Sequence, residues 1–213
     1  MTTTKRPVRP YGGVSAEERV ADRHERLLEA GLEEFGTRGV GQTGVKDICR
    51  QAGLTDRYFY ESFRDSAELF TAVFDRATQH LFEVVAGALA QAPASPEAQS
   101  RAVIEAYVRA LADDPRLARV VFVEAPSAGP EVEHHIRATL RRFARLVEAG
   151  ARPYVPAKMP DAALRFGATS LVGAIERLMI EWQDGELGLS VEQIIDYLVD
   201  MLLLFGRAAG MKV

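Results

Sequence analysis

Cysteine is nearly absent from this 213-residue sequence, which contains Cys49 alone. A single thiol excludes an internal disulfide framework and a cysteine-rich zinc site, and it fits a reducing compartment such as the cytoplasm. Long apolar runs are also missing. The most apolar stretch, residues 194–205, is interrupted by Asp196 and Asp200 and is far shorter than the ~20 residues of a membrane span. Because no apolar run follows the charged N-terminus, we expect a cytoplasmic protein without a signal peptide and without a membrane partner.

The sequence also lacks a large net charge. Its 26 basic and 30 acidic residues give a formal charge of −4, and the first 66 residues hold 11 of each sign. Nucleic-acid binding therefore has to be argued from a motif, because bulk charge does not supply it. Enzyme motifs are missing as well, since we find no glycine-rich phosphate loop, no nucleophile elbow and no spaced set of metal ligands. We expect no catalytic residues, no metal site and no cofactor.

What the sequence does contain is the composition of a folded domain, with 47% apolar and 26% charged residues. Its length is sufficient to bury a core without disulfides or metals. After residue 14 almost every segment has helical periodicity, and no run alternates β-branched with polar residues. The clearest helix-start signals are Ser15 with Glu18, Asp65 with Glu68, Ser95 with Pro96, and Ser190 with Gln193. We predict an all-α fold of about nine helices, preceded by a flexible basic arm over residues 1–14.

Two short predicted helices, residues 45–52 and 55–63, flank a tight turn at Gly53 and Leu54. This spacing is typical of a helix-turn-helix, in which the first helix braces the second so that its N-terminal half enters the major groove of DNA. We expect Ile48, Leu54 and Phe59 to pack the two helices together. The side chains that remain free to face outward are Lys46, Arg57, Tyr58, Tyr60 and Ser62.

A longer string of residues, between about positions 19 and 74, has the spacing of one known family. Its members are Leu27-Leu28-Glu29-Ala30, Phe35, Arg38-Gly39, Thr43, Val45-Lys46-Asp47-Ile48, Ala52-Gly53-Leu54-Thr55, Phe59-Tyr60, Phe63 and Glu68-Leu69. With these residues the chain resembles the TetR family of transcriptional regulators. The resemblance implies a homodimeric repressor with a DNA-binding domain at residues 15–65 and its motif at about 44–63. It also implies a ligand-binding and dimerisation domain at residues 66–213.

The resemblance also implies roles for single residues. Thr43 and Tyr60 match positions that touch phosphates, while Arg57 and Tyr58 lie on the face that reads bases. The predicted DNA-binding set is Thr43, Lys46, Thr55, Arg57, Tyr58, Tyr60 and Ser62. Two departures from the family pattern matter. Ser66 stands where a lysine often contacts phosphate, and a bulky pair at positions 57 and 58 replaces small residues, so the operator sequence cannot be taken from relatives.

The middle helices of the larger domain, about residues 97–149, carry a few polar groups beside apolar stripes. A carboxylate on such a face either pairs with an arginine or lines a cavity, and both interpretations stay open for Glu124. His135 is either a ligand contact or a histidine satisfied at the edge of the stripe. The predicted ligand-binding set is Tyr107, Val121, Glu124, His135, Thr139 and Phe143. We expect a hydrophobic molecule of drug size with a polar or acidic end.

The last predicted helix, residues 190–209, is apolar on two sides, and the helix before it has small residues that permit close approach. One face of each would pack within the subunit and the other against a second copy, in a two-fold interface of four helices. The predicted interface residues are Gly167, Ser170, Ala174, Val199 and Leu203. We therefore predict a ligand-responsive repressor on a palindromic operator. The alternative is an all-α carrier of small molecules that binds no specific DNA.

Overall fold

The computed structural model describes residues 15–211, so the arm predicted over residues 1–14 lies outside the described residues. Within the described range the fold is all-α, as predicted, with nine α-helices and no strand. The helices are α1 (Ala16–Thr37), α2 (Val45–Ala52), α3 (Asp56–Ser62), α4 (Ser66–Gln91), α5 (Pro96–Asp113), α6 (Pro115–Ala118), α7 (Pro130–Ala151), α8 (Asp161–Gln183) and α9 (Val191–Ala208). None of them combines the length and the apolar character that crossing a bilayer requires.

Side-chain caps fix where several helices begin. The Ser15 hydroxyl accepts a hydrogen bond from the Glu18 amide at 3.0 Å, and the Glu18 carboxylate accepts one from the Ser15 amide at 2.6 Å. Such bonds satisfy amide groups that the first helical turn leaves without partners. The predicted starts at Asp65, Ser95 and Ser190 are confirmed by equivalent side-chain caps on α4, α5 and α9.

The segment 115–124 contains two kinds of helix. Helix α6 ends at Ala118, and a π-helix, η3 (Arg119–Glu124), follows it. In a π-helix the backbone bonds join residues five apart, and the Arg119 and Glu124 side chains, also five apart, meet at 3.1 Å. A 3-10 turn, η4 (Ala125–Ser127), leads on to α7.

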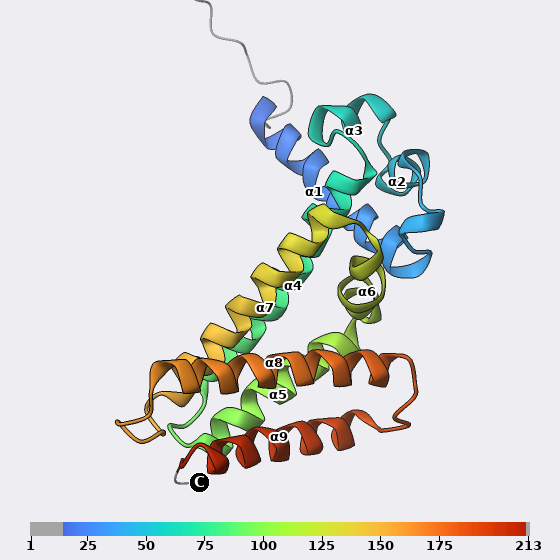
Figure 1. Cartoon of the computed structure of the whole chain (residues 1–213). Coiled ribbons are helices and arrows are strands. Elements are labelled where there is room, and N and C mark those ends of the chain that lie inside the picture. The colour runs from blue at the N-terminus through green and yellow to red at the C-terminus, as the bar shows by residue number, and fades with distance from the viewer. Residues whose placement is uncertain (1–14, 212–213) are drawn as a thin grey trace, which may run out of the picture.

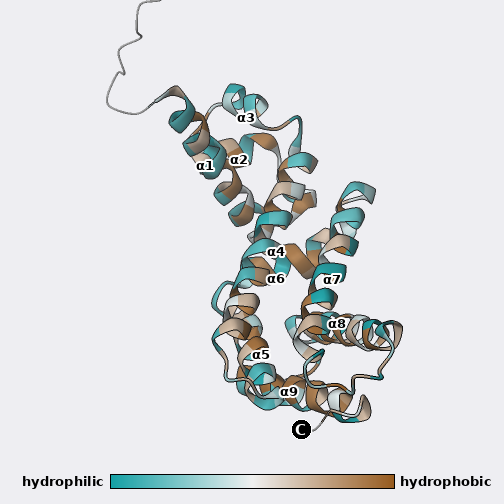
Figure 2. Ribbon diagram, turned by 90° about the vertical axis from the view of Figure 1, so that its left-hand side faces the viewer, coloured by the Kyte–Doolittle hydropathy of each residue, from teal (hydrophilic) through white to brown (hydrophobic). Residues whose placement is uncertain are grey.

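The helices form a head and a body (Figure 1). Helices α1, α2 and α3 make the head, and α4 runs from beneath it to the far end of the body, with α7 alongside. In the body α4 packs on α5, α5 on α9, and α7 on α8. Figure 2 shows apolar residues of α5 and α9 at the end of the body away from the head. Helix α4 is thus the longest direct connection between head and body.

One cluster of buried apolar side chains extends through both parts. In the head the rings of Phe35 (α1) and Phe70 (α4) meet edge to face, with centroids 5.2 Å apart. Further along α4, Leu81 is buried in the same cluster, which reaches Leu198 in α9. The head and the body therefore share one close-packed interior, to which α4 contributes in both parts.

Candidate DNA-binding surface and ligand cavity

The helix-turn-helix is held together from within, as predicted. Ile48 of α2 and Phe59 of α3 are fully buried, and Leu54 of the turn packs against the same core. Gly53 closes α2 with φ at +62°, a left-handed conformation that favours glycine. Cys49 is buried too, and its burial together with the nearby Asp56 carboxylate raises the pKa of the thiol to about 11. The thiol is therefore an unreactive part of the core.

An arginine of α1 fixes the turn, and sequence reasoning missed it. The Arg26 guanidinium donates to the Ala52 carbonyl from Nε at 3.1 Å and from Nη2 at 2.6 Å. Nη2 also lies 3.2 Å from the Gly53 carbonyl oxygen. These carbonyls end α2 and have no partner within the helix. The charge-assisted bonds from Arg26 thus tie the end of α2 and the turn to α1.

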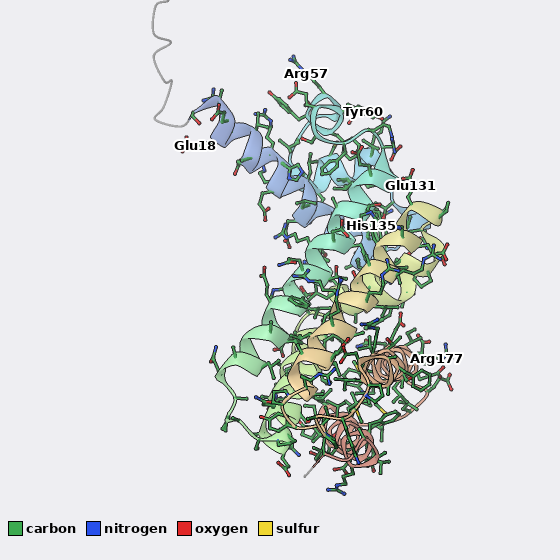
Figure 3. The ribbon with its side chains drawn as sticks, turned by 60° about the vertical axis from the view of Figure 1, so that its left-hand side comes forward. Glu18, Arg57, Tyr60, Glu131, His135 and Arg177 are labelled. Carbon is green, nitrogen blue, oxygen red and sulfur yellow. The ribbon has the colours of Figure 1, made fainter. Side chains whose placement is uncertain are left out.

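Helix α3 presents two side chains outward. The Arg57 side chain is 83% exposed, Tyr60 is 61% exposed, and Figure 3 shows both on the part of the head that is far from the body, with Arg57 pointing away. The Tyr60 ring meets the buried Phe59 ring edge to face, with centroids 5.4 Å apart, and this contact holds the Tyr60 ring in place on α3. Arg57 Nε lies 3.0 Å from Glu61 Oε1, an exposed pair that contributes little and can be exchanged for a phosphate or a base. Lys46 and Thr55 are exposed on the same motif.

Three residues of the predicted DNA-binding set are less available. Thr43 is buried, and its hydroxyl donates to the Gly39 carbonyl at 2.8 Å. The phosphate contact at Thr43 stays a prediction. Tyr58, predicted to face outward, is half-buried because the Arg23 guanidinium lies over its ring, 4.5 Å from the centroid. Ser62 is half-buried at the end of α3.

A cavity of about 100 Å³ lies in the body, and side chains of α4, α5, α7, α8, α9 and η3 line it. Four residues of the predicted ligand-binding set are among them, namely Tyr107, Val121, Thr139 and Phe143. The Tyr107 and Phe143 rings stand at 64° with centroids 6.0 Å apart. Fourteen of the eighteen lining side chains are apolar, and the polar ones are Thr78, Tyr107, Thr139 and Glu176. Such a lining favours a ligand that is mostly hydrocarbon.

Glu176 of α8 was missed by sequence reasoning. Burial raises the pKa of its carboxyl, and burial together with the Glu176 charge raises the pKa of the Tyr107 hydroxyl. A signal was present, because Val172, Ile175 and Glu176 have the i, i+3, i+4 spacing of one helical face and all three line the cavity. In the sequence, the small residues of this helix assigned it to the dimer interface, and the possibility that the face with Glu176 lines a cavity was not considered.

Two members of the predicted ligand-binding set, Glu124 and His135, do not line this cavity. Both follow the other interpretation that the sequence left open, a side chain satisfied by a polar partner. Glu124 accepts a hydrogen bond from the Val40 amide at 2.8 Å and one from Arg119 Nε at 3.1 Å. His135 lies with Nδ1 2.8 Å from Asp75 Oδ1, and Figure 3 shows it near the end of α7 that approaches the head. Each has a polar partner of its own. Among residues 15–211 no three His, Cys, Asp or Glu side chains are grouped to hold a metal ion.

Glu124 and Arg119 belong to a polar junction between head and body. Arg119 Nη1 donates to the Thr37 carbonyl at the end of α1 at 2.7 Å. Gly39, with φ at +90°, leaves room for the Glu124 carboxylate, because an added Cβ would lie 2.7 Å from Glu124 Oε1. We call Glu124, Arg119 and the backbone of residues 37–40 the η3 latch. It ties the end of α1 to the helix that carries Val121, a residue of the cavity wall.

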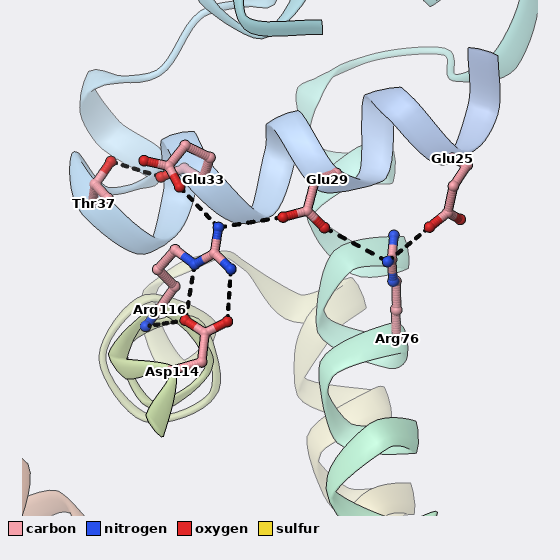
Figure 4. A network of polar contacts seen from close by, with 7 residues as sticks. All are labelled: Glu25, Glu29, Glu33, Thr37, Arg76, Asp114 and Arg116. Atoms are coloured by element: carbon pink, nitrogen blue, oxygen red, sulfur yellow. Dashed lines mark hydrogen bonds and ion pairs between the residues drawn. The ribbon is translucent and has the colours of Figure 1, made fainter. Parts of the chain in front are cut away.

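A second set of ion pairs joins α1 to α4 and α6 (Figure 4). Arg116 Nη1 lies 2.8 Å from Glu33 and 3.3 Å from Glu29, and Arg116 Nη2 lies 2.7 Å from Asp114. Arg76 of α4 pairs with Glu25 at 2.7 Å. The bond from Arg116 lowers the pKa of the Asp114 carboxyl, and Asp114 followed by Glu33 raises that of Arg116. The acidic stripe of α1 is therefore neutralised by the body.

The predicted dimer residues fall into two groups. Gly167, Ser170, Ala174 and Leu203 are partly exposed, but Val199 is buried within the subunit, where α9 packs on α5. Val199 therefore belongs to the core of the subunit, and the interface itself stays a prediction. The large apolar residues exposed on α8 and α9 are Phe166, Tyr197, Leu204 and Phe205.

A helix-turn-helix with an exposed second helix, joined to a helical body that encloses an apolar cavity, defines a DNA-binding regulator. Residues 27–73 match the family model described as bacterial regulatory proteins, tetR family. This match identifies the DNA-binding segment of the chain as that of the TetR family of bacterial transcriptional regulators.

Proteins similar to this chain are named as transcriptional regulators. The HTH-type transcriptional activator FasR of Mycolicibacterium smegmatis is 28% identical over 131 residues, which are 61% of this chain and 59% of FasR. The HTH-type transcriptional regulator AcrR of Shigella flexneri is 24% identical over 191 residues, 84% of this chain and 89% of AcrR. The structure of the regulator FadR from Bacillus subtilis in complex with stearoyl-CoA superposes with a TM-score of 0.72 at 17% identity, covering 84% of this chain and 97% of FadR. This last likeness concerns the fold.

Proposed function

We propose that this protein is a cytoplasmic, homodimeric repressor that leaves its operator when a small hydrophobic molecule binds in the body. The observation that carries the proposal is the physical connection between the cavity and the end of α1 in the head. Val121 and Phe122 line the cavity, and the same π-helix grips the end of α1 through the η3 latch. A simple carrier would need neither this connection nor the outward Arg57 and Tyr60.

The size of the cavity supports a mechanism in which the ligand acts as a wedge. About 100 Å³ is well below the roughly 300–1,000 Å³ of sites that hold drug-sized molecules. A ligand of that size has to displace α4, α7 or η3 from their close-packed positions. Helix α4 packs against α1, and the η3 latch joins η3 to the end of α1, so this displacement changes the position of the head. Ligand and operator then favour different arrangements, which is the thermodynamic requirement for release.

The dimer is proposed on the exposed apolar residues of α8 and α9. Phe166 is 76% exposed and Leu204 63% exposed, with Tyr197 and Phe205 also uncovered. Tyr197, Met201 and Leu204 follow the i, i+4, i+7 spacing of one helical stripe. Pairing α8 and α9 with the same helices of a second copy would cover this surface by two-fold symmetry. Two heads could then read half-sites one DNA turn apart, about 34–36 Å, which requires a palindromic operator.

The test is selection of genomic DNA fragments by the full chain, followed by a compound screen for release. We expect one enriched palindromic sequence, and increased expression of a reporter behind it when the protein is deleted. Decreased reporter expression on deletion would identify an activator, the role that the name of FasR states. No enriched sequence would favour the carrier.

A further inference from the structure

The charge of the cavity lining determines what kind of ligand it can accept. Among the eighteen lining side chains Glu176 alone carries a formal charge, and no lysine, arginine or histidine is among them. Thr78 is not available as a donor, because its hydroxyl already donates to the Phe74 carbonyl at 2.9 Å. The lining therefore offers a ligand one carboxylate, the hydroxyls of Tyr107 and Thr139, and hydrocarbon.

Glu176 has no partner among residues 15–211. Its carboxylate makes no hydrogen bond and no ion pair there, although charged groups are near it in the sequence and in the body. Arg177, the next residue, forms an ion pair with Glu181 and points outward in Figure 3. Arg142 of α7 lies over the Phe82 ring, 3.6 Å from its centroid, and does not line the cavity. The other charges thus leave Glu176 uncompensated.

Glu176 is half-buried, so its carboxylate has lost part of its contact with water, and a counter-charge in the cavity would offset that loss. The faces of aromatic rings add a second attraction for a cation, and Tyr107 and Phe143 present two rings in the same lining. A ligand that brings a positive charge would therefore pair with a half-buried carboxylate that has no ion-pair partner among residues 15–211. A ligand with a carboxylate or phosphate would instead place like charges together.

We propose that the effector is a lipophilic cation, a protonated amine or a quaternary ammonium. Its charged end pairs with Glu176 beside Tyr107, and its hydrocarbon part lies among the apolar residues of α4 and α7. This inference rests on the proposed function, because it takes the cavity as the effector site. The sequence predicts a polar or acidic end for the ligand, and this inference replaces the acidic alternative with a cationic one; a cation also differs in charge from the stearoyl-CoA in the FadR complex.

The test uses three probes of equal chain length and different charge: octylamine, octanol and octanoate. Binding to the full chain without DNA is measured by calorimetry, with the fluorescence of Trp182, the one tryptophan, as a second signal. Trp182 lies on α8 with Glu176, and its indole N–H donates to the Leu189 carbonyl at 2.8 Å. We expect octylamine to bind most tightly and octanoate most weakly.

The specificity is then traced to one side chain. Glu176→Gln keeps the shape and removes the charge, and we expect it to weaken octylamine about 10- to 100-fold, the range of a charge-assisted bond, with octanol unchanged. Glu181→Gln is the matched control, because Glu181 lies on the same helix but does not line the cavity, and it should leave all three affinities unchanged. Thermal melting of each variant confirms that it is folded.

The outcomes separate this inference from the proposed function. Three results would overturn the inference that the effector is a lipophilic cation. They are octanoate binding as tightly as octylamine, equal octylamine affinity in wild type and Glu176→Gln, and no binding of any probe. Octylamine that binds through Glu176 but leaves the selected operator occupied would support the ligand class and contradict ligand-induced release. Release of the operator by octanoate alone would contradict the ligand class and support the proposed function.

Discussion

Removing the carboxylate of the η3 latch tests how head and body are held together. In Glu124→Ala the Val40 amide loses its acceptor at 2.8 Å, and Arg119 keeps only the Thr37 carbonyl. The Glu124 side chain is 13% exposed, so water replaces the lost acceptor poorly. A hydrogen bond to a charged group contributes about 1.5–3 kcal/mol. The partly exposed pair with Arg119 adds at most about 1 kcal/mol.

We therefore expect Glu124→Ala to lower the free energy of unfolding by about 2–3 kcal/mol. With a urea m-value of about 2 kcal/mol/M this lowers the denaturation midpoint by about 1 M, measured by circular dichroism. Glu133→Ala is the control, because Glu133 on α7 is exposed and pairs only with Arg137 at 3.3 Å. Its midpoint should match that of the wild type. Equal midpoints for Glu124→Ala and Glu133→Ala would refute the latch as a stabilising contact.

Four further predictions follow from the described contacts. Arg57→Ala should weaken operator binding by about 1–3 kcal/mol and relax preference at one base pair, whereas Tyr60→Phe should weaken all sequences alike; electrophoretic mobility shifts with operator variants measure both. Gly39→Ala should cost about 1–3 kcal/mol in urea denaturation, since φ is +90° and the new Cβ meets Glu124, and an unchanged midpoint would contradict the crowding. Leu204→Glu should give monomers in analytical ultracentrifugation and abolish operator binding, and a dimeric variant would disprove the proposed interface. Burial raises the pKa of Glu176, so its charge opposes folding at neutral pH, and Glu176→Gln should melt at a higher temperature than wild type at pH 7.5. The difference in melting temperature should vanish as the pH falls to the ordinary range of a glutamate. A difference that persists at that pH would show another cause.

The sequence predicted what depends on neighbours along the chain. The cap at Ser15 and the left-handed Gly53 are written in short patterns, because the groups that they satisfy lie within a few residues. The burial of Phe59 followed from helical spacing in the same way. These local rules were sufficient for the all-α fold and for the position of the reading helix.

What the sequence could not show depends on partners far along the chain. Glu124 meets Val40 across 84 positions, and Arg26 meets Ala52 across 26, so neither contact leaves a periodic signal. Thr43 turned inward because the Gly39 carbonyl was an available acceptor. For Glu176, the apolar face was visible in the sequence, but the cavity on that face is formed by four other helices and η3.

The central claim is that a molecule in the body controls DNA binding by the head. It is tested most directly by fluorescence anisotropy of the selected operator with the full chain, while octylamine is titrated into the preformed complex. The account predicts specific binding in the range of about 10⁻⁸–10⁻¹¹ M without ligand, and loss of the operator at octylamine concentrations that saturate the cavity of the wild type but not of Glu176→Gln. Operator binding that stays constant while calorimetry shows the cavity filled would contradict it.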